Sequence, residues 1–351
     1  MLSLTQTYRN AVGLLAQGVV GRAVSQWQPQ GRVLTFHGLR APDDDLLLDK
    51  ALHTPVELFR AICRHLAENY RVVPLRDLVP GSQAAARSIT DGVAITFDDG
   101  YASNYELAYP VLREFGLPAT IFLTSGFLDR TVRLWFHRIE QALMRTRLEH
   151  CLIEIGNQSI DVSLESPSAR AHALGILLRA VKSLPQEGMD EQVARIESAL
   201  QVEINSDASA EPPTHRPLTW EQAREMQSSG LIELGGHTHR HWILGRCRPE
   251  TAEFEIMHSA ERITAELGIA PKLFAYPNGQ PGDYSPATIE ILRRAGYEAA
   301  VTTSAGGIGG DGCAFELPRY GAPVSLPEAA ATVSGLFELL KCLRTQVAPA
   351  G

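Results

Sequence analysis

The sequence predicts an α/β fold, an irregular (β/α)7-type barrel of parallel strands with a mostly helical insertion. Short apolar runs such as Val93–Phe97 lack polar alternation, which is typical of parallel strands buried on both faces. These runs alternate along the chain with amphipathic segments, which favours right-handed strand–helix–strand units. About seven or eight candidate strands are present, near the number that a closed parallel barrel requires.

Each element follows from its local pattern. Strands are predicted at the short apolar runs, and helices where apolar residues recur every three or four positions. The predicted strands are Val33–Phe36, Arg71–Pro74, Val93–Phe97, Pro118–Leu123, a run ending near Gly235, Lys272–Ala275, Glu298–Thr303 and Phe315–Tyr320. The predicted helices are Pro55–Asn69, Tyr101–Phe115, Leu218–Gly230 with Thr219 as N-cap, Pro249–Leu267, Ser285–Ala295 and Leu326–Leu343.

The alternation of strands and helices is interrupted between Thr131 and Pro217. This segment contains amphipathic pieces and ends in a polar, proline-containing stretch that we expect to be flexible. The predicted organisation is an N-terminal amphipathic helix (1–30), a barrel (31–130 and 218–325), a helical insertion (131–217), and a C-terminal helix and tail (326–351).

Composition excludes several classes of protein. The net charge of −8 argues against a nucleic-acid surface, because phosphate binding needs clustered Lys and Arg. The five cysteines are widely spaced without a C-x-x-C pair, which indicates free thiols in a reducing compartment. No apolar run reaches the length of a membrane span. We therefore expect a cytoplasmic protein whose N-terminal helix contacts either the inner membrane surface or the barrel.

Polar side chains follow the predicted strands at the point where each strand ends. In α/β proteins the carboxyl ends of the strands carry the chemistry. Asp98 and Asp99 are adjacent carboxylates. If they are shielded from water, they need a nearby cation or a shared proton. The alternative is that Asp-Asp-Gly is only a turn. The residues at predicted strand ends are His37, Asp98, Asp99, His237, His241, Asn278 and Arg319.

His237 and His241 are a candidate metal pair. Histidines four residues apart share one face of a helix and can bind one ion together. With Asp99 they form a two-histidine, one-carboxylate set that suits zinc, and also cobalt, nickel or iron. The alternative is that each is an ordinary solvated or hydrogen-bonded histidine.

Three motifs resemble those of the polysaccharide deacetylase family, the NodB-homology domain of carbohydrate esterase family four. T-F-D-D-G-Y (Thr96–Tyr101) and H-T-x-x-H (His237–His241) resemble the first two motifs, and F-A-Y-P-N-G (Phe274–Gly279) resembles the third. The likeness covers Val33–Pro323 apart from the insertion. It implies an irregular (β/α)7 barrel and metal-dependent removal of N- or O-acetyl groups from sugars.

The resemblance also implies a role for each motif residue. Asp99, His237 and His241 would bind the metal, and Asp98 would be the catalytic base. The backbone N–H at Asn278 would stabilise the oxyanion. Tyr276 and Tyr101, which belong to these motifs, are predicted to contact the substrate.

The chain departs from the family pattern at three places. Ala275 stands where an arginine is usual, Asn278 stands where a tyrosine is common, and the late motif that supplies the acid histidine is not evident. One branch of the family looks permuted and takes its acid histidine from a segment early in the chain, Y-H-x-x. T-F-H-G-L (Thr35–Leu39) resembles that early segment. His37 is therefore the predicted acid, with a buried packing role as the alternative. Arg319 is predicted to replace the missing arginine and orient Asp98.

Together these features predict a metal-dependent N-deacetylase acting on an acetylated sugar, nucleotide sugar or lipid-linked glycan in bacterial surface polysaccharide or glycolipid biosynthesis. For Trp135 and Phe136, at the start of the insertion, the sequence leaves two expectations open. They line a glycan or lipid site, or they pack in a core. Two alternatives remain open. The same metal site could hydrolyse another amide, such as a formyl group or a cyclic ureide, or the chain could be a catalytically silent glycan-binding domain.

Overall fold

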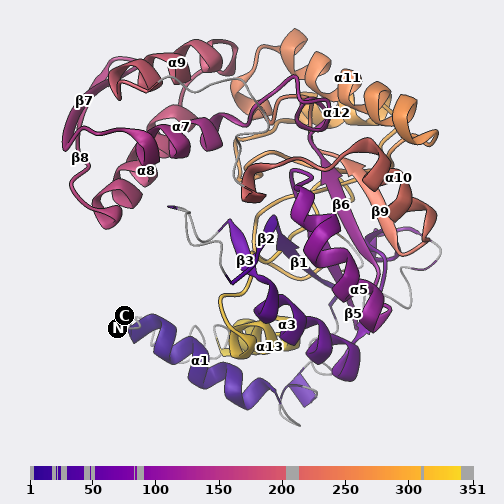
Figure 1. The fold of residues 1–351 in the computed structure, drawn as a ribbon. Helices are drawn as coiled ribbons and strands as arrows, with labels where there is room; N and C mark the ends of the chain where they lie inside the picture. Colours follow the sequence, from indigo (N-terminus) through magenta and orange to yellow (C-terminus); the bar gives the residue numbers. More distant parts are fainter. Residues whose placement is uncertain are drawn as a thin grey trace, which may run out of the picture.

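The computed structural model describes residues 4–17, 21, 23–24, 30–42, 48, 52–82, 84, 91–202, 213–309 and 312–340. Figure 1 shows a strongly curved sheet with helices on its outer side and a separate group of elements projecting from one end. The polar stretch before Pro217 that we expect to be flexible lies largely outside the described residues. In the described part, no helix combines the length and apolar character needed to span a bilayer.

The central sheet is parallel, as the apolar runs predict. Its strand order is β1-β5-β6-β9-β10-β11. The short strand β4 also pairs parallel with β5, at the first two residues of β5. Every buried strand in this order is followed by a helix or loop that crosses back, so the predicted α/β barrel class is confirmed. The strands are β1 (Arg32–Phe36), β4 (Arg71–Val72), β5 (Gly92–Phe97), β6 (Ala119–Leu123), β9 (Ile232–Gly236), β10 (Leu273–Ala275) and β11 (Ala299–Val301).

A short extended segment closes the barrel between β11 and β1. Leu317 forms a parallel bridge to Val301, and Tyr320 forms one to Leu34. The prediction of a continuous strand at Phe315–Tyr320 is therefore wrong in extent. Pro318 lies between the two bridges and has no N–H to donate to a ladder. The closure nevertheless brings Arg319 to the inside of the barrel, where its side chain is buried.

The helices agree well with the periodicity of the sequence. The Thr219 side chain accepts from the Gln222 N–H and forms the predicted capping box. The predicted helix Leu326–Leu343 is interrupted in the described residues: α13 ends before Gly335, which adopts a left-handed conformation, and residues 336–340 are helical again. The barrel helices are α3 (Val56–Asn69), α5 (Tyr109–Phe115), α6 (Ser125–Leu128), α10 (Trp220–Ser228), α11 (Pro249–Leu267), α12 (Pro286–Arg294) and α13 (Leu326–Ser334).

The insertion contains a hairpin that the sequence analysis did not predict. Strands β7 (His150–Ile155) and β8 (Gln158–Ser163) pair antiparallel, and β7 alternates exposed and buried residues along its length. Gly156 takes a positive φ at the turn. This period of two is the signal that distinguishes the hairpin from the helices on either side of it. The expectation of a mostly helical insertion still holds for α7 (Trp135–Arg145), α8 (Pro167–Lys182) and α9 (Met189–Ala199).

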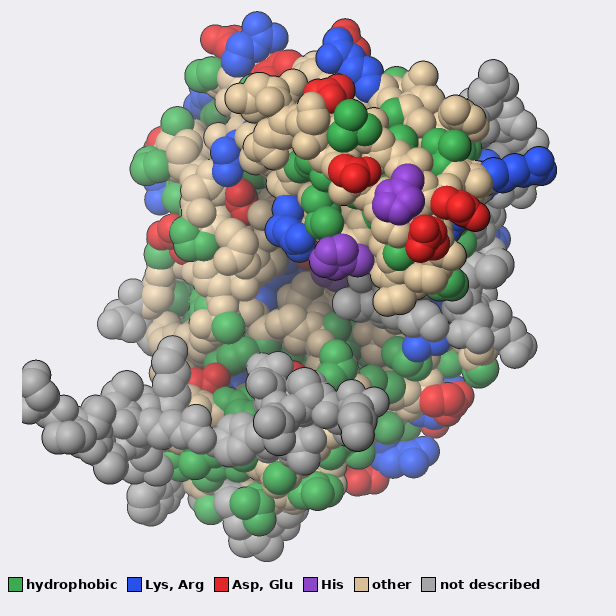
Figure 2. Space-filling model, turned by 90° about the vertical axis from the view of Figure 1, so that its left-hand side faces the viewer, with side chains coloured by type: hydrophobic (Ala, Val, Ile, Leu, Met, Phe, Trp, Pro, Cys, Tyr) green, Lys and Arg blue, Asp and Glu red, His purple; other side chains and the backbone are tan. Residues whose placement is uncertain are grey.

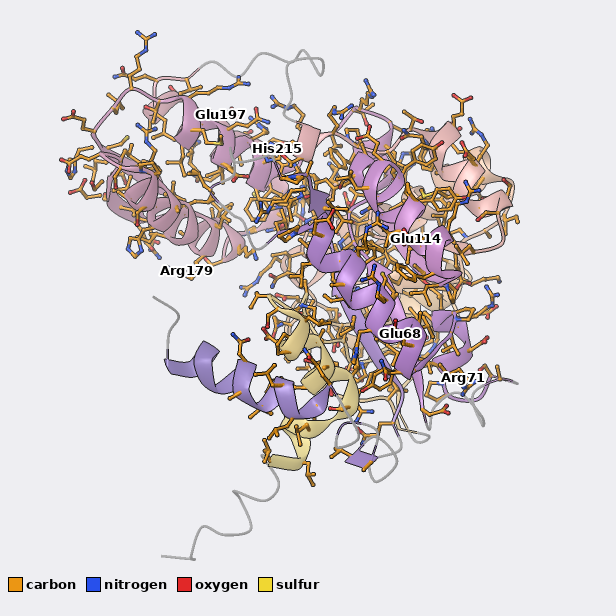
Figure 3. The ribbon with its side chains drawn as sticks, turned by 60° about the horizontal axis from the view of Figure 1, so that its bottom comes forward. Glu68, Arg71, Glu114, Arg179, Glu197 and His215 are labelled. Carbon is orange, nitrogen blue, oxygen red and sulfur yellow. The ribbon has the colours of Figure 1, made fainter. Side chains whose placement is uncertain are left out.

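The insertion has an apolar core of its own, built from α7, α8, α9 and the buried face of the hairpin. Arg138 on α7 donates to both carboxylate oxygens of Glu197 on α9, at 2.8 and 2.7 Å. Figure 3 shows Glu197 on α9, Arg179 near the end of α8, and His215 where the chain returns to the barrel. Apolar residues of α8 are buried in the same core, so this helix is packed against the rest of the insertion.

The N-terminal helix α1 (Leu4–Ala16) lies on α13, as Figure 1 shows. Gly13 allows the close approach, because a Cβ there would lie 1.9 Å from the Pro327 carbonyl oxygen. Val12 and Ala16 are buried in the contact, whereas Leu14 and Leu15 are 64% and 62% exposed. The sequence predicts that this helix contacts either the membrane or the rest of the chain, and in the structure it packs against the rest of the chain.

Candidate active site

Strand register places the predicted residues side by side at one edge of the sheet. Phe36 of β1 is paired with Phe97 of β5, so His37 and Asp98 leave their strands at the same level. Leu123 of β6 pairs with Gly236 of β9, directly before His237. Because parallel strands carry their carboxyl ends to the same edge, residues far apart in the sequence meet there.

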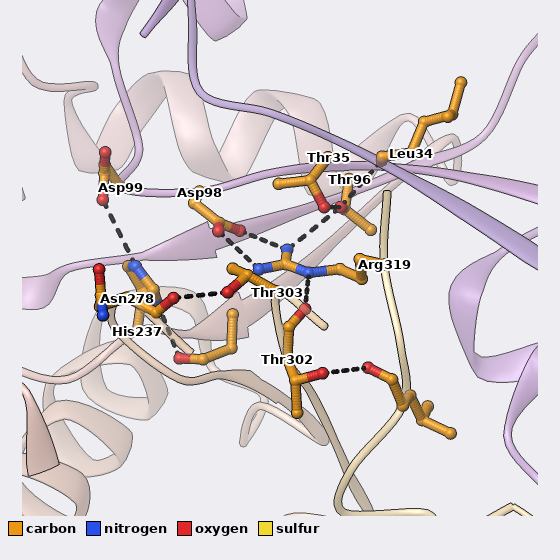
Figure 4. Close-up of polar contacts among 12 residues, drawn as sticks. Leu34, Thr35, Thr96, Asp98, Asp99, His237, Asn278, Thr302, Thr303 and Arg319 are labelled. Atoms are coloured by element: carbon orange, nitrogen blue, oxygen red, sulfur yellow. Dashed lines mark hydrogen bonds and ion pairs between the residues drawn. The ribbon is translucent and has the colours of Figure 1, made fainter. Parts of the chain in front are cut away.

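Asp98 and Arg319 form a buried, two-pronged ion pair, shown in Figure 4. The two terminal nitrogens of Arg319 donate to the two Asp98 oxygens, each at 2.7 Å. Arg319 is itself oriented by the Thr302 carbonyl oxygen, which accepts from Nε at 2.9 Å. Burial alone would raise the pKa of Asp98, but the guanidinium outweighs it and holds the pKa below its usual range. Asp98 is therefore an ionised carboxylate in a fixed orientation.

Asp99, His237 and His241 converge on one point. The Nε2 atoms of His237 and His241 lie 3.4 and 3.2 Å from Asp99 Oδ1. His237 Nδ1 lies 2.7 Å from the Ala275 carbonyl oxygen, which suits an N–H donor and leaves Nε2 free to bind a ligand. Burial would raise the pKa of Asp99, but the neighbouring imidazoles hold it well below its usual range. The predicted two-histidine, one-carboxylate group thus exists in the fold.

These three residues fit a divalent metal ion. Asp99 is fully buried, and among the described residues neither of its carboxylate oxygens has a hydrogen-bond donor. A buried charge without hydrogen bonds is costly unless a cation neutralises it. Two ligand atoms that bind one ion tetrahedrally at about 2.0–2.2 Å lie roughly 3.4 Å apart, close to the separations found here.

The backbone around the site is strained. Asp99, His241 and Asn278 have φ angles of 74°, 57° and 62°, in the left-handed region that non-glycine residues seldom adopt. The prediction that His237 and His241 share a helical face is wrong, because residues 237–241 form a loop. The loop turns at Thr238, whose φ is 64°, and so brings the two imidazoles together without a helix.

A second group of histidines does not form a comparable site. His53, His137 and His215 are buried with ring nitrogens near one another. However, the rings of His137 and His215 stack at 4.0 Å with an angle of 12° between their planes. Imidazole lone pairs lie in the ring plane, so two nearly parallel rings do not direct them at one ion. His137 instead bonds to the Tyr101 hydroxyl at 2.8 Å, and His215 to Glu140 at 3.0 Å, linking the insertion to the barrel.

His53 should make the protein sensitive to acid. Burial lowers the pKa of His53 from 6.5 to about 3 in the folded protein. Between these values the unfolded chain binds more protons, so the free energy of unfolding falls as the pH decreases below 6.5. One such histidine contributes a slope of about 1.4 kcal/mol per pH unit. Urea unfolding at pH 4, 5 and 6 should show this slope reduced in His53→Gln but retained in the exposed-site control His150→Gln; equal slopes in all three proteins would contradict the assignment.

A cavity of about 290 Å³ lies in front of these groups. It is close to the small end of ligand pockets, which hold about 300–1,000 Å³, and so suits one sugar ring with a small substituent. The predicted candidates Trp135 and Phe136 are on its wall, and Phe136 packs edge-on against His241 with ring centres 5.2 Å apart. The lining residues are His37, Leu52, Asp98, Asp99, Trp135, Phe136, Leu178, Lys182, His237, His241, Ile243, Asn278 and Thr303.

The two predicted substrate-contacting tyrosines lie elsewhere. Tyr276 is fully buried, donates to the Phe315 carbonyl oxygen at 3.0 Å and stacks on Tyr284. Tyr101 is also fully buried and uses its hydroxyl on His137. Neither lines the cavity, so direct substrate contact by either side chain is not supported. Both are motif residues whose side chains pack in the interior of the fold.

Asn278 lines the cavity, but its side chain is already occupied. Its amide oxygen accepts from Lys182 Nζ at 2.8 Å, and its amide nitrogen donates to Asp283. Thr303 Oγ1 donates to the Asn278 carbonyl oxygen at 2.6 Å and holds the turn in place, as Figure 4 shows. The sequence analysis missed Lys182, because nothing local to α8 signals that it faces a turn 96 residues away.

Sequence comparison links more than half of the chain to one family. The model of the family described as polysaccharide deacetylase matches residues 87–210 and 203–300. YxkH of Bacillus subtilis (strain 168), which is named provisionally as a polysaccharide deacetylase, is 39% identical over 69 residues. That match spans 20% of this chain and only 23% of YxkH.

Several solved structures share the fold. The Streptococcus pyogenes deacetylase PplD, solved in complex with acetate, is similar with a TM-score of 0.56 and 17% identity, over 87% of this chain and 99% of PplD. IcaB from Ammonifex degensii is similar with a TM-score of 0.52 and 20% identity, over 87% of this chain and 97% of IcaB. At such identities the likeness shows a common fold.

Proposed function

Since the chain belongs to the polysaccharide deacetylase family, we propose that it is a metal-dependent hydrolase that removes N-acetyl groups from a sugar. The observation that carries the proposal is the convergence of Asp99, His237 and His241 beside the ionised Asp98, with a cavity in front of all four. Such a set leaves open positions for water and substrate, which distinguishes a catalytic from a purely structural metal site.

Asp99, His237 and His241 are the residues that would hold the ion. A divalent metal, zinc or alternatively cobalt, nickel or iron, supplies Lewis-acid chemistry when bound: it acidifies water and polarises the acetyl carbonyl. Asp98 accepts the proton of the attacking water. Each Asp98 oxygen keeps a second lone pair beyond the one used by Arg319, so the ion pair orients the base without blocking it.

The other two groups act on the acetyl oxygen and the leaving nitrogen. The Asn278 side chain is engaged by Lys182 and Asp283, so the backbone N–H is the donor we assign to the developing oxyanion. His37 lines the cavity beside Asp98 and donates a proton to the leaving amine. An amine leaves poorly without that proton, so the acid is needed more for an amide than for an ester.

Loss of His37 should therefore affect amides selectively. In His37→Gln, we expect kcat for an N-acetyl sugar to fall by about 10²- to 10⁴-fold, the usual contribution of a general acid. Hydrolysis of 4-nitrophenyl acetate, whose leaving group needs no proton, should change far less. Acetate release and 4-nitrophenol absorbance measure the two rates on the same preparation. Equal losses on both substrates would assign His37 a structural role instead.

A screen of acetylated sugars with assay of released acetate tests the function as a whole. Release of formate from formylated sugars, or opening of a cyclic ureide, without acetate release would favour the alternative amide hydrolases. Absence of all three activities together with absence of stoichiometric metal in the purified protein would favour a silent glycan-binding domain. Metal analysis thus separates the catalytic from the non-catalytic proposals.

We place the reaction in the assembly of bacterial surface polysaccharide or glycolipid, on a cytoplasmic nucleotide-sugar or lipid-linked intermediate. The described cysteines Cys63, Cys151, Cys247 and Cys313 are free thiols, which supports a reducing compartment. The exposed Leu14 and Leu15 on α1 support contact of this helix with the membrane surface. Co-sedimentation with anionic vesicles, compared between the wild type and a Leu14→Ser, Leu15→Ser variant, tests that contact.

A further inference from the structure

The two histidines of the candidate metal site are held in different ways. The His237 ring is bonded through Nδ1 to the Ala275 carbonyl oxygen, and its backbone N–H donates to the Leu123 carbonyl oxygen at 2.9 Å. The His241 ring has no such anchor, because among the described residues its buried Nδ1 has no hydrogen-bond partner. A metal-binding histidine normally has a partner on its second ring nitrogen, which fixes the direction of the ring. The direction of His241 therefore depends on the Phe136 ring packed against it and on the loop backbone that carries it.

That loop is held by a buried carboxylate. Glu255 of α11 is fully buried, and its Oε2 accepts from the backbone N–H groups of His239 and Arg240, at 3.0 and 2.8 Å. Successive backbone N–H groups that point to one side form a concave site for an anion. The two residues lie between Thr238 and His241, whose φ angles of 64° and 57° are left-handed. Such backbone persists only where surrounding contacts enforce it, and Glu255 supplies the acceptor for both intervening N–H groups.

The second oxygen of the same carboxylate binds the loop through a side chain. Arg240 Nε donates to Glu255 Oε1 at 2.5 Å, and the guanidinium lies over the Trp242 ring, 3.7 Å from the ring centre. Burial raises the pKa of Glu255 above its ordinary value, while Arg240 and the two N–H groups act against this. Because a buried carboxylate is costly unless it is hydrogen-bonded, Glu255 and the loop stabilise each other.

We propose that Glu255 is a positioning residue for the metal site: by fixing the loop 237–241 it directs the His241 imidazole at the ion and so raises the affinity for that ion. This inference rests on the proposed function, because it concerns the metal that Asp99, His237 and His241 would hold. Glu255 does not line the cavity, so it acts through the loop and not by contact with the substrate.

The affinity of the folded protein for zinc tests this inference. Figure 2 views the side on which α8 faces β3 (His53–Pro55) in Figure 1, and the surface there is hollowed. Since α8 and the residue before β3 both contribute to the cavity wall, we expect Zn²⁺ and a competing chelator to reach the ligands without unfolding.

Two variants of Glu255 should weaken the site to different degrees. Glu255→Leu removes both acceptor oxygens and should raise the Kd for Zn²⁺ about 10- to 100-fold, the usual effect of losing an outer partner of a metal ligand. Glu255→Gln keeps one oxygen for the two N–H groups and should raise the Kd by about three- to tenfold, the loss of one hydrogen bond. Chelator competition measures both values, and Glu255→Gln decides the question if Glu255→Leu does not fold.

A double-mutant cycle shows whether Glu255 acts through His241. In a His241→Ala background the loop no longer carries the imidazole that Glu255 is proposed to direct. Glu255→Gln should then change the remaining Kd by less than about twofold, within the error of additivity. A loss as large as in the wild-type background would show that Glu255 acts on another ligand and would overturn the proposal.

Glu197→Gln is the matched control for stability. Glu197 pairs with Arg138 within the insertion, so this variant should lower the unfolding temperature of the metal-free protein but keep the Kd within about twofold of wild type. A wild-type Kd in both Glu255 variants would reject the role of Glu255 and leave the proposed function intact. A wild-type protein that binds none of Zn²⁺, Co²⁺, Ni²⁺ and Fe²⁺ would reject the metal-dependent function and this inference with it.

Discussion

An Asp98→Asn variant should lose about 10²- to 10⁴-fold in kcat for acetate release and still bind its metal. Asparagine has nearly the same shape as aspartate and can still accept one hydrogen bond from Arg319, but it cannot accept the proton of the attacking water. Asp99, His237 and His241 are untouched by the change. Acetate release and metal content, measured on the same purified protein, check both parts of the expectation.

A matched control is available elsewhere in the barrel. Asp129 forms a similar two-pronged pair with Arg262, at 2.9 and 2.7 Å, and does not line the cavity. Asp129→Asn should keep full kcat. Breaking a buried ion pair costs about 3–5 kcal/mol, so thermal unfolding must first show that Asp98→Asn is folded. A folded Asp98→Asn with wild-type turnover, or one that has lost its metal, would reject the role of base.

His237→Ala should lose both the metal and the activity. The His237 ring is held by the Ala275 carbonyl oxygen with Nε2 toward Asp99, and alanine removes that ligand without changing the loop backbone. Two remaining protein ligands bind a divalent ion far more weakly than three, so acetate release should fall to background at micromolar protein. Elemental analysis after gel filtration measures the loss directly.

His239→Ala is the control for this variant. His239 lies in the same loop, but its Nδ1 contacts the Ser125 hydroxyl at 3.0 Å and its ring packs on His258, away from Asp99. We expect it to keep stoichiometric metal. Full metal content in His237→Ala, or loss of metal in His239→Ala to the same degree, would show that the ion binds elsewhere.

Short-range features of the site were predictable because they depend on neighbouring residues. The strand before Asp98 and the turn after it are encoded by consecutive residues. The structure contains this strand as β5, which ends directly before Asp98. His37 could be located next to Asp98 because parallel strands bring their carboxyl ends to one edge. The hairpin β7–β8 was missed although its alternation was visible, because helical pieces on either side suggested a helical region.

Other features could be seen only once distant segments were placed. The resemblance predicted that Arg319 orients Asp98, but the two-pronged geometry of that contact, made across 221 residues, is not encoded in the local sequence. The left-handed backbone at Asp99, His241 and Asn278 is enforced by surrounding contacts against the preference of these residue types. For the same reason, the sequence could name His237 and His241 as candidate metal ligands, whereas the helix predicted to carry them was wrong.

By itself, the sequence determined the alternation of the parallel strands and helices of the barrel, the chemical types at the strand ends, and the family to which they point, because each is encoded within a few consecutive residues. The tertiary structure decided how distant side chains meet: it gives the two-pronged geometry of the predicted Arg319–Asp98 pair, and it alone brings Lys182 of the insertion to Asn278. Such contacts depend on how the barrel closes and how the insertion packs over it. Those outcomes are set by the sum of many weak interactions spread over the whole chain.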